Sequence, residues 1–74
     1  MKFRIVCTDN YNLPSKRYPL LKENFTMLLE DGIEYIFIDN LEELLTIENV
    51  IHENIIVSNS GSIPSIEIYD DYRE

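Results

Sequence analysis

A short acidic stretch that ends in glycine, between two apolar segments, constrains the fold of this chain more than any other feature. Residues Glu30, Asp31 and Gly32 separate Phe25–Leu29 from Ile33–Ile38. A three-residue hairpin loop prefers glycine at its last, left-handed position, which Gly32 occupies. We therefore predict an antiparallel hairpin whose turn lies at residues 30–32.

This turn also predicts how the two strands pair. It places Leu29 opposite Ile33, Met27 opposite Tyr35 and Phe25 opposite Phe37, so one face of the hairpin is entirely apolar. We expect that face to be buried. The other face then carries Asn24, Thr26, Leu28, Glu34, Ile36 and Ile38.

A second interpretation of the same segment stays open. Leucine, lysine, glutamate and methionine are frequent over residues 20–30, and all four have high helix propensity. These residues can instead form a helix that ends at Gly32 and leads into a parallel strand over residues 33–38. The two interpretations differ in whether residues 20–30 are helix or strand.

The segments on either side of residues 20–38 carry clearer patterns. Phe3, Ile5 and Cys7 alternate with other residues, which predicts a half-buried first strand. Asparagines and prolines over residues 9–19 predict a long irregular loop. Near the other end, residues 55–57 predict a short buried strand, and residues 63–69 a last strand with Ile66 and Ile68 inward.

The clearest helix follows the hairpin. Asp39 or Asn40 can cap it, and a glutamate three residues later completes a capping box. Asn54 is expected to end it. The helix has an apolar stripe, formed by Leu41, Leu44, Leu45, Ile47 and Ile51. Its acidic side faces water and carries Glu42, Glu43 and Glu48.

These elements predict a single domain over residues 1–74 with an α+β fold. We expect a small, largely antiparallel sheet of four to five strands with one helix packed on one face. If residues 20–30 are helical, the order becomes βαβαββ with two helices. A chain of 74 residues is near the lower limit for independent stability. A second apolar sheet face of Leu28, Ile36 and Ile38 therefore offers a route to a homodimer.

Composition excludes several classes of protein. The chain is 45% hydrophobic, which argues against disorder, and its single cysteine excludes an internal disulfide. No apolar run reaches the length of about 18 residues that a membrane span needs, and the N-terminus lacks a signal-peptide pattern. We expect a cytoplasmic protein that does not bind membranes.

The net charge of −8 is distributed unevenly. Residues 1–22 carry five basic side chains and one acidic one, for a net charge of +4. Residues 23–74 carry 13 acidic side chains and one basic one, for a net charge of −12. Such an excess of acid repels nucleic acid, so we expect no direct nucleic-acid binding and instead a basic protein as partner.

No residue pattern indicates catalysis or a cofactor. Cys7 and His52 are single residues of their kinds, and a nucleophilic pair would also need a third, orienting group. Asp70, Asp71 and Glu74 follow no known metal-ligand spacing. Residues 58–62 contain no lysine and do not match a phosphate-binding loop. We predict that the protein is not an enzyme and holds neither cofactor nor metal.

The C-terminal segment combines carboxylates with tyrosines, a combination that suits a protein interface. In size, charge and composition the whole chain resembles the small acidic inhibitors of phages and mobile elements, including anti-CRISPR and other anti-defence proteins. The resemblance implies an inhibitor that presents carboxylates, as a DNA mimic does, to a nuclease or other nucleic-acid-binding protein. The residues expected to bind the partner are Glu42, Glu43, Glu48, Glu67, Tyr69, Asp70, Asp71, Tyr72 and Glu74.

A different class of function fits the same sequence. A non-catalytic housekeeping or assembly module would act through dimerisation or through pairing of sheet edges. Its association would depend little on salt, whereas docking of an acidic surface would weaken steeply as salt rises.

Overall fold

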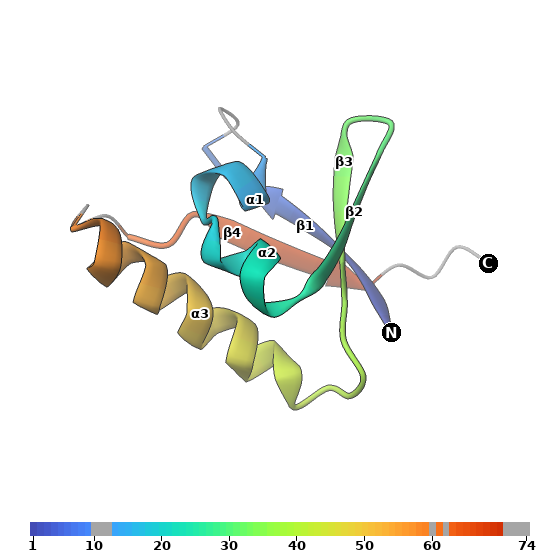
Figure 1. Cartoon of the computed structure of the whole chain (residues 1–74). Helices are drawn as coiled ribbons and strands as arrows, with labels where there is room; N and C mark the ends of the chain where they lie inside the picture. Colours follow the sequence, from blue (N-terminus) through green and yellow to red (C-terminus); the bar gives the residue numbers. More distant parts are fainter. Residues whose placement is uncertain (10–12, 60, 62, 71–74) are drawn as a thin grey trace.

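The computed structural model describes residues 1–9, 13–59, 61 and 63–70. Figure 1 shows a four-stranded sheet with helices on one side, which confirms the predicted α+β class. The elements in chain order are β1 (Lys2–Cys7), α1 (Pro14–Arg17), α2 (Leu20–Asn24), β2 (Thr26–Glu30), β3 (Ile33–Phe37), α3 (Glu43–Ser58) and β4 (Ile66–Asp70).

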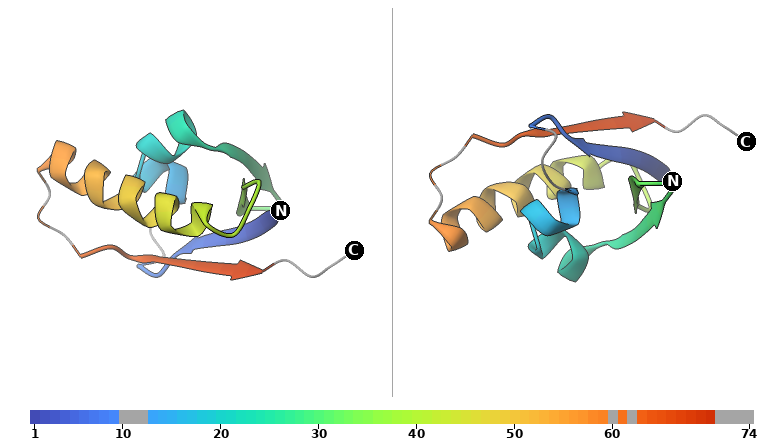
Figure 2. Two further views of the ribbon diagram at one scale, coloured as in Figure 1. Left: turned by 90° about the horizontal axis from the view of Figure 1, so that it is seen from below. Right: turned by 90° about the horizontal axis from the view of Figure 1, so that it is seen from above.

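The sheet has the strand order β2-β3-β1-β4, and every neighbouring pair is antiparallel. β1 is therefore a central strand, and β2 and β4 form the two edges. As predicted, Phe3, Ile5 and Cys7 of β1 are all buried. Figure 2 shows that the three helices lie on the same face of this sheet, so the core lies between them and the strands.

The prediction of an irregular loop over residues 9–19 is wrong for its second half, because α1 begins at Pro14. Proline suits the first turn of a helix, since its fixed φ matches the helix and its missing N–H would have no partner there. Tyr18 follows α1 and is buried, and its hydroxyl oxygen accepts a hydrogen bond of 3.2 Å from the Ser65 N–H. Tyr11, in the first half of the predicted loop, lies outside the described residues.

Both interpretations of residues 20–30 are correct for part of the segment. α2 occupies Leu20–Asn24, and the strand β2 begins two residues later at Thr26. The side-chain amide of Asn24 donates a hydrogen bond of 2.7 Å to the Leu20 carbonyl oxygen. This bond joins the two ends of the short helix. The next residue, Phe25, has extended backbone angles.

The hairpin is confirmed, but its predicted register is wrong by one residue. The turn contains two residues, Asp31 and Gly32, with φ of +53° and +77°. Positive φ at both positions is the pattern of a type I′ turn. Glu30 consequently pairs with Ile33, and Met27 with Ile36. A shift of one residue exchanges the two faces of a strand.

That exchange also overturns the predicted second apolar face. Ile36 and Ile38 are buried in the core under the helices, whereas Leu28 is 40% exposed. Leu28 pairs with Tyr35, which is on the opposite face of β3 from Ile36. The three residues therefore do not form one outer surface.

α3 is longer than predicted. Asn54 is a buried residue inside it, and residues 55–57 are its last turns rather than a strand. The helix ends at Asn59, which has a left-handed φ of +54°. Asparagine tolerates this conformation better than most residues. The last strand is shorter than predicted, because it begins at Ile66 and Ile63 is 83% exposed before it.

Candidate functional site

The predicted capping box is only partly present, because α3 begins after Glu42, which caps it without a side-chain hydrogen bond. One carboxylate oxygen of Glu43 accepts hydrogen bonds from the backbone N–H groups of Asp39, at 2.7 Å, and Asn40, at 3.3 Å. The Asn40 side-chain oxygen accepts a bond of 3.1 Å from the Glu42 N–H. Glu43 is therefore half-buried in a structural role, whereas the neighbouring Glu42 is exposed.

The path of the chain after α3 places the helix and the last strand beside each other in opposite directions. Figure 2 shows that the start of α3 and the end of β4 lie at the same end of the molecule. The space between α3 and β4 forms a groove of about 440 Å³. We call it the α3–β4 groove, and its lining residues are Phe3, Leu44, Glu48, Ile51, His52, Pro64, Ile66 and Ile68.

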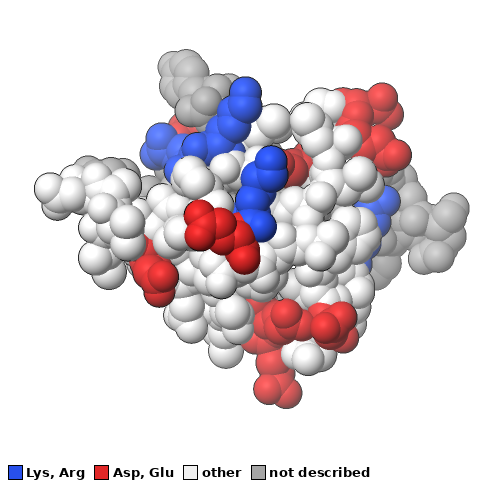
Figure 3. All heavy atoms as spheres, viewed as in Figure 1, with Lys and Arg blue, Asp and Glu red and all other residues white. Residues whose placement is uncertain are grey.

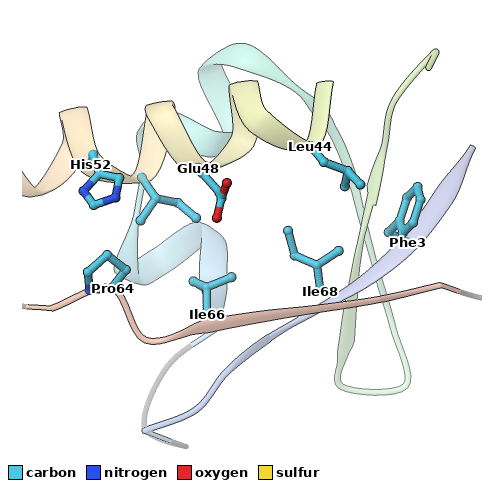
Figure 4. Close-up of a pocket in the computed structure, with 8 residues that line it drawn as sticks. Phe3, Leu44, Glu48, His52, Pro64, Ile66 and Ile68 are labelled. Atoms are coloured by element: carbon cyan, nitrogen blue, oxygen red, sulfur yellow. The ribbon is translucent and has the colours of Figure 1, made fainter. Parts of the chain in front are cut away.

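The groove exists because the buried side of α3 packs against α2 and the core rather than against β4. Its buried residues Ile47, Ile51 and Asn54 face the rest of the core. The Asn54 side-chain oxygen accepts a hydrogen bond of 2.9 Å from the Leu20 N–H, which attaches α3 to α2. Ile66 and Ile68 point toward the helices as predicted, but they are only half-buried. Figure 4 shows these isoleucines of β4 facing Leu44 and Glu48 of α3 across the groove.

Exposed apolar side chains extend this surface beyond the groove. Leu41 and Leu45 are 56% and 66% exposed, so the predicted apolar stripe is not wholly buried. Ile56, which was expected in a buried strand, is 76% exposed. Residues three, four or seven apart lie on the same side of a helix, so Leu45 and Ile56 lie on the side of α3 that carries Glu48 and His52, and Leu41 lies in the turn before the helix.

The structure brings together some of the predicted partner-binding residues. Asp70 pairs with Phe3, so its side chain lies on the same face of the sheet as the groove. Glu48 lines the groove, and Glu42 lies at the start of the helix that forms one wall. These three carboxylates are exposed. Asp71, Tyr72 and Glu74 lie outside the described residues.

Glu67 and Tyr69 lie on the opposite face of the sheet, because they alternate with Ile66 and Ile68 along β4. The Tyr69 hydroxyl donates a hydrogen bond of 2.5 Å to Glu67. This bond to a carboxylate raises the pKa of Tyr69 above its usual value, and partial burial acts in the same direction. The Arg4 guanidinium carbon lies 5.0 Å from the centre of the Tyr69 ring.

The basic first strand is thus not separated from the acidic last strand in space. β1 pairs with β4 over its length, and Lys2 lies 4.4 Å from the ring centre of Tyr35 on the neighbouring β3. Figure 3 shows the remaining acidic side chains in separate groups, near the tip of the β2–β3 hairpin and near the start of α3, with basic ones over α1 and α2.

Cys7 and His52 occupy different environments. Cys7 is 3% exposed, and burial together with the charge of Asp9 raises the pKa of its thiol to about 11. A protonated, buried thiol is a poor nucleophile. His52 is exposed on the groove rim opposite Pro64 (Figure 4). Within the described ranges, no three histidine, cysteine or carboxylate side chains are grouped so that they could hold a metal ion.

The sequence contained a signal for the groove that periodicity alone does not use. Apolar residues occupy more positions of the helix than one buried face requires: Leu44, Leu45, Ile47, Ile51, Ile55 and Ile56. A helix that is apolar over more than one face has further surface to cover. The surplus marks the side of α3 that borders the groove.

Comparison with known proteins adds no relationship. No family model, no curated protein and no solved structure matches the chain. In the part of the chain that the structure describes, none of the helices has both the length and the hydropathy that crossing a membrane requires.

Proposed function

We propose that this protein is a small acidic protein-binding module that docks on a basic partner protein. The observation that carries this proposal is the α3–β4 groove, where apolar side chains and exposed carboxylates share one surface. Interfaces commonly combine an apolar centre with a charged rim that guides the encounter. Glu48 lies in the groove, and Glu42 and Asp70 lie near its end.

The chemistry of the site favours a basic partner. None of the described residues that line the groove is a lysine or arginine, and the whole chain carries a net charge of −8. Arginine and lysine side chains of a partner would pair with these carboxylates through charge-assisted hydrogen bonds. A phosphate backbone would be repelled by them.

The partner we propose is a nuclease or another nucleic-acid-binding protein, because its binding surface is built for anionic ligands. The carboxylates would occupy positions that phosphates otherwise take, so the module would act as an inhibitor. This role is that of the anti-defence proteins of phages and mobile elements that the chain resembles. It requires no catalysis and takes place in the cytoplasm.

The test is affinity capture with the immobilised full chain from a cell lysate at low salt. We expect a basic protein that elutes as salt is raised and that an excess of duplex DNA displaces. Glu42→Lys with Asp70→Lys should reduce its capture at least tenfold. The matched control, Glu23→Lys with Glu53→Lys, changes exposed residues away from the groove. Because each reversal adds two charges, both pairs change the net charge from −8 to −4.

Two results would contradict the proposal. Equal capture by the wild type and by the Glu42 and Asp70 pair would exclude these carboxylates from the interface. Equal loss with both pairs would show that net charge, rather than this surface, attracts the partner.

A second candidate function has its own support. β2 and β4 are the edges of the described sheet, and Leu28 and Tyr69, on its face away from the helices, are each 40% exposed. An assembly module would pair such edges or faces with those of another copy. Size-exclusion chromatography at low and high salt separates the two functions, because only the assembly module forms an oligomer that persists in both.

A further inference from the structure

The edge strand β4 offers both its backbone and its side chains to a ligand in the α3–β4 groove. The Thr8 N–H donates a hydrogen bond of 2.8 Å to the Ser65 carbonyl oxygen, which fixes the phase of the β1–β4 ladder. In an antiparallel ladder, bonded and non-bonded pairs alternate. The N–H and C=O groups of Glu67 and Tyr69 therefore point toward β1, and those of Ile66 and Ile68 point toward the open edge.

Ile66 and Ile68 are also the residues of β4 whose side chains line the groove. A strand that pairs with this edge would place residues directly opposite them. Side chains of directly opposite residues lie on the same face of a sheet. Alternate side chains of such a strand would consequently enter the groove, between β4 and α3.

We propose, on the basis of the function proposed above, that the groove binds an extended segment of the basic partner, which adds to β4 as a fifth strand. Alternate residues of this segment are apolar and occupy the groove. One residue on the same face is a lysine or arginine that pairs with Glu48. This mode of recognition takes affinity from backbone hydrogen bonds and specificity from the side-chain pockets.

Charge argues against a second copy of this chain as the occupant. Pairing β4 with another β4 would bring two molecules together that each carry a net charge of −8. It would also place Glu67 and Asp70 of both copies along one short pair of strands. Like charges that face each other across strands are destabilising. A basic segment meets no such repulsion.

The dimensions suit a short segment. The groove of about 440 Å³ lies within the range of small-ligand sites, which is roughly 300–1,000 Å³. A strand rises about 3.3 Å per residue, so a segment of about five to seven residues spans β4. Exposed Leu45 and Ile56 on the outer side of α3 offer further contact to residues beyond the segment.

The experiment uses the isotope-labelled full chain and a blocked peptide, acetyl-TVTKTVT-amide, as a probe whose alternate residues are apolar or basic. On binding, the backbone amides of Ile66 and Ile68 should shift in the NMR spectrum and become protected from hydrogen exchange. The peptide acetyl-TVTETVT-amide, in which glutamate replaces the lysine, should bind at least fivefold more weakly.

Two single variants test the role of Glu48. Glu48→Gln should weaken binding of the lysine peptide at least threefold and should leave binding of the glutamate peptide the same or stronger. Glu53→Gln removes an equal charge from another exposed position of α3 and should change neither. Both side chains are exposed, so neither variant is expected to unfold the protein.

Other results would overturn the inference. Shifts confined to the face of Leu28 and Tyr69 would place the peptide elsewhere. A free protein that is dimeric and already protects the Ile66 and Ile68 amides would make the second copy the occupant. Capture of a basic partner that depends on Glu42 and Asp70, with no peptide effect at Ile66 and Ile68, would retain the proposed function and reject the strand addition. Peptide binding without such a partner would retain the groove and reject the function.

Discussion

Ser15 donates two hydrogen bonds to Glu34. Its backbone N–H contacts one carboxylate oxygen at 2.8 Å, and its hydroxyl contacts the other at 2.5 Å. Both residues are buried, and Glu34 lies on β3 on the face that the helices cover. A four-residue helix is not stable by itself, so this contact attaches α1 to the sheet.

Replacing the Ser15 hydroxyl should therefore destabilise the fold. Ser15→Ala leaves one oxygen of a buried carboxylate without its partner, which costs about 1–3 kcal/mol. The control is Ser58→Ala, since the Ser58 hydroxyl donates a hydrogen bond to the Ile55 carbonyl oxygen at an exposed helix end. Urea denaturation should show a clear loss for the first variant and less than about 0.5 kcal/mol for the second. Equal losses would exclude a special role for the Ser15–Glu34 contact.

The same contact explains why the sequence predicted the wrong hairpin register. A glutamate on a strand is expected to face water, and that expectation turned Glu34 outward together with Ile36 and Ile38. Burial of Glu34 depends on a partner 19 residues earlier in the chain. Local pattern does not contain that information. The turn chemistry at Asp31 and Gly32 was consistent with both a two-residue and a three-residue loop.

The observed register predicts how much Ile36 of β3 and Leu28 of the neighbouring β2 each contribute to stability. Ile36 is fully buried, so Ile36→Ala should cost about 2–5 kcal/mol. Leu28 faces the other side of the sheet and is 40% exposed, so Leu28→Ala should cost less than about 1 kcal/mol. Thermal or urea unfolding of both variants measures the difference. A reversed order would restore the register that places Ile36 on the outer face.

Other features could be predicted where local signals were sufficient. The alternation of β1 and the hydrogen bond from the Asn40 N–H to the Glu43 carboxylate both follow from residues close in sequence, and both are present. The end of α3 was missed because Asn54 resembles a terminator, whereas its side chain accepts a bond from Leu20. The surplus of apolar residues on α3 indicated a further surface to cover, but the position of the groove depends on the packing of α3 against α2, which is distant in sequence. Glu48 was expected as a binding residue, but its apolar neighbours Ile66 and Ile68 were expected only in the core.

Burial of Cys7 should make the stability of the fold depend on alkaline pH. Its pKa is raised from 9.0 to about 11 by burial first and by Asp9 second. The folded state therefore retains the thiol proton over a range in which the unfolded state loses it. The contribution of the protonated Cys7 thiol to the free energy of unfolding is fully present below pH 9. It disappears as pH rises to about 11, with a change on the order of 2 kcal/mol.

The control for this prediction is Cys7→Ala, which removes the titrating group and leaves every other one. The stability of the wild type relative to this variant should decrease between about pH 9 and 11. A constant difference would show that the thiol titrates normally. In the native protein at neutral pH, we also expect slow reaction with a thiol reagent and fast reaction in denaturing urea.

The excess of negative charge predicts opposite effects of salt on the free protein and on its complex. Self-repulsion at a net charge of −8 destabilises the compact state, and salt screens it. Raising sodium chloride from about 0.01 M to about 1 M shortens the screening length roughly tenfold. We expect the free protein to gain about 1 kcal/mol, or about 4–8 °C in Tm, over this range. The complex with a basic partner should weaken over the same range, since salt screens attraction between its components.

The Glu42→Lys and Asp70→Lys pair halves the net charge and should halve or further reduce the gain in Tm. A Tm that falls with salt would show that attractive pairs, such as Arg17 with Asp9 at 3.2 Å, outweigh the repulsion among the carboxylates.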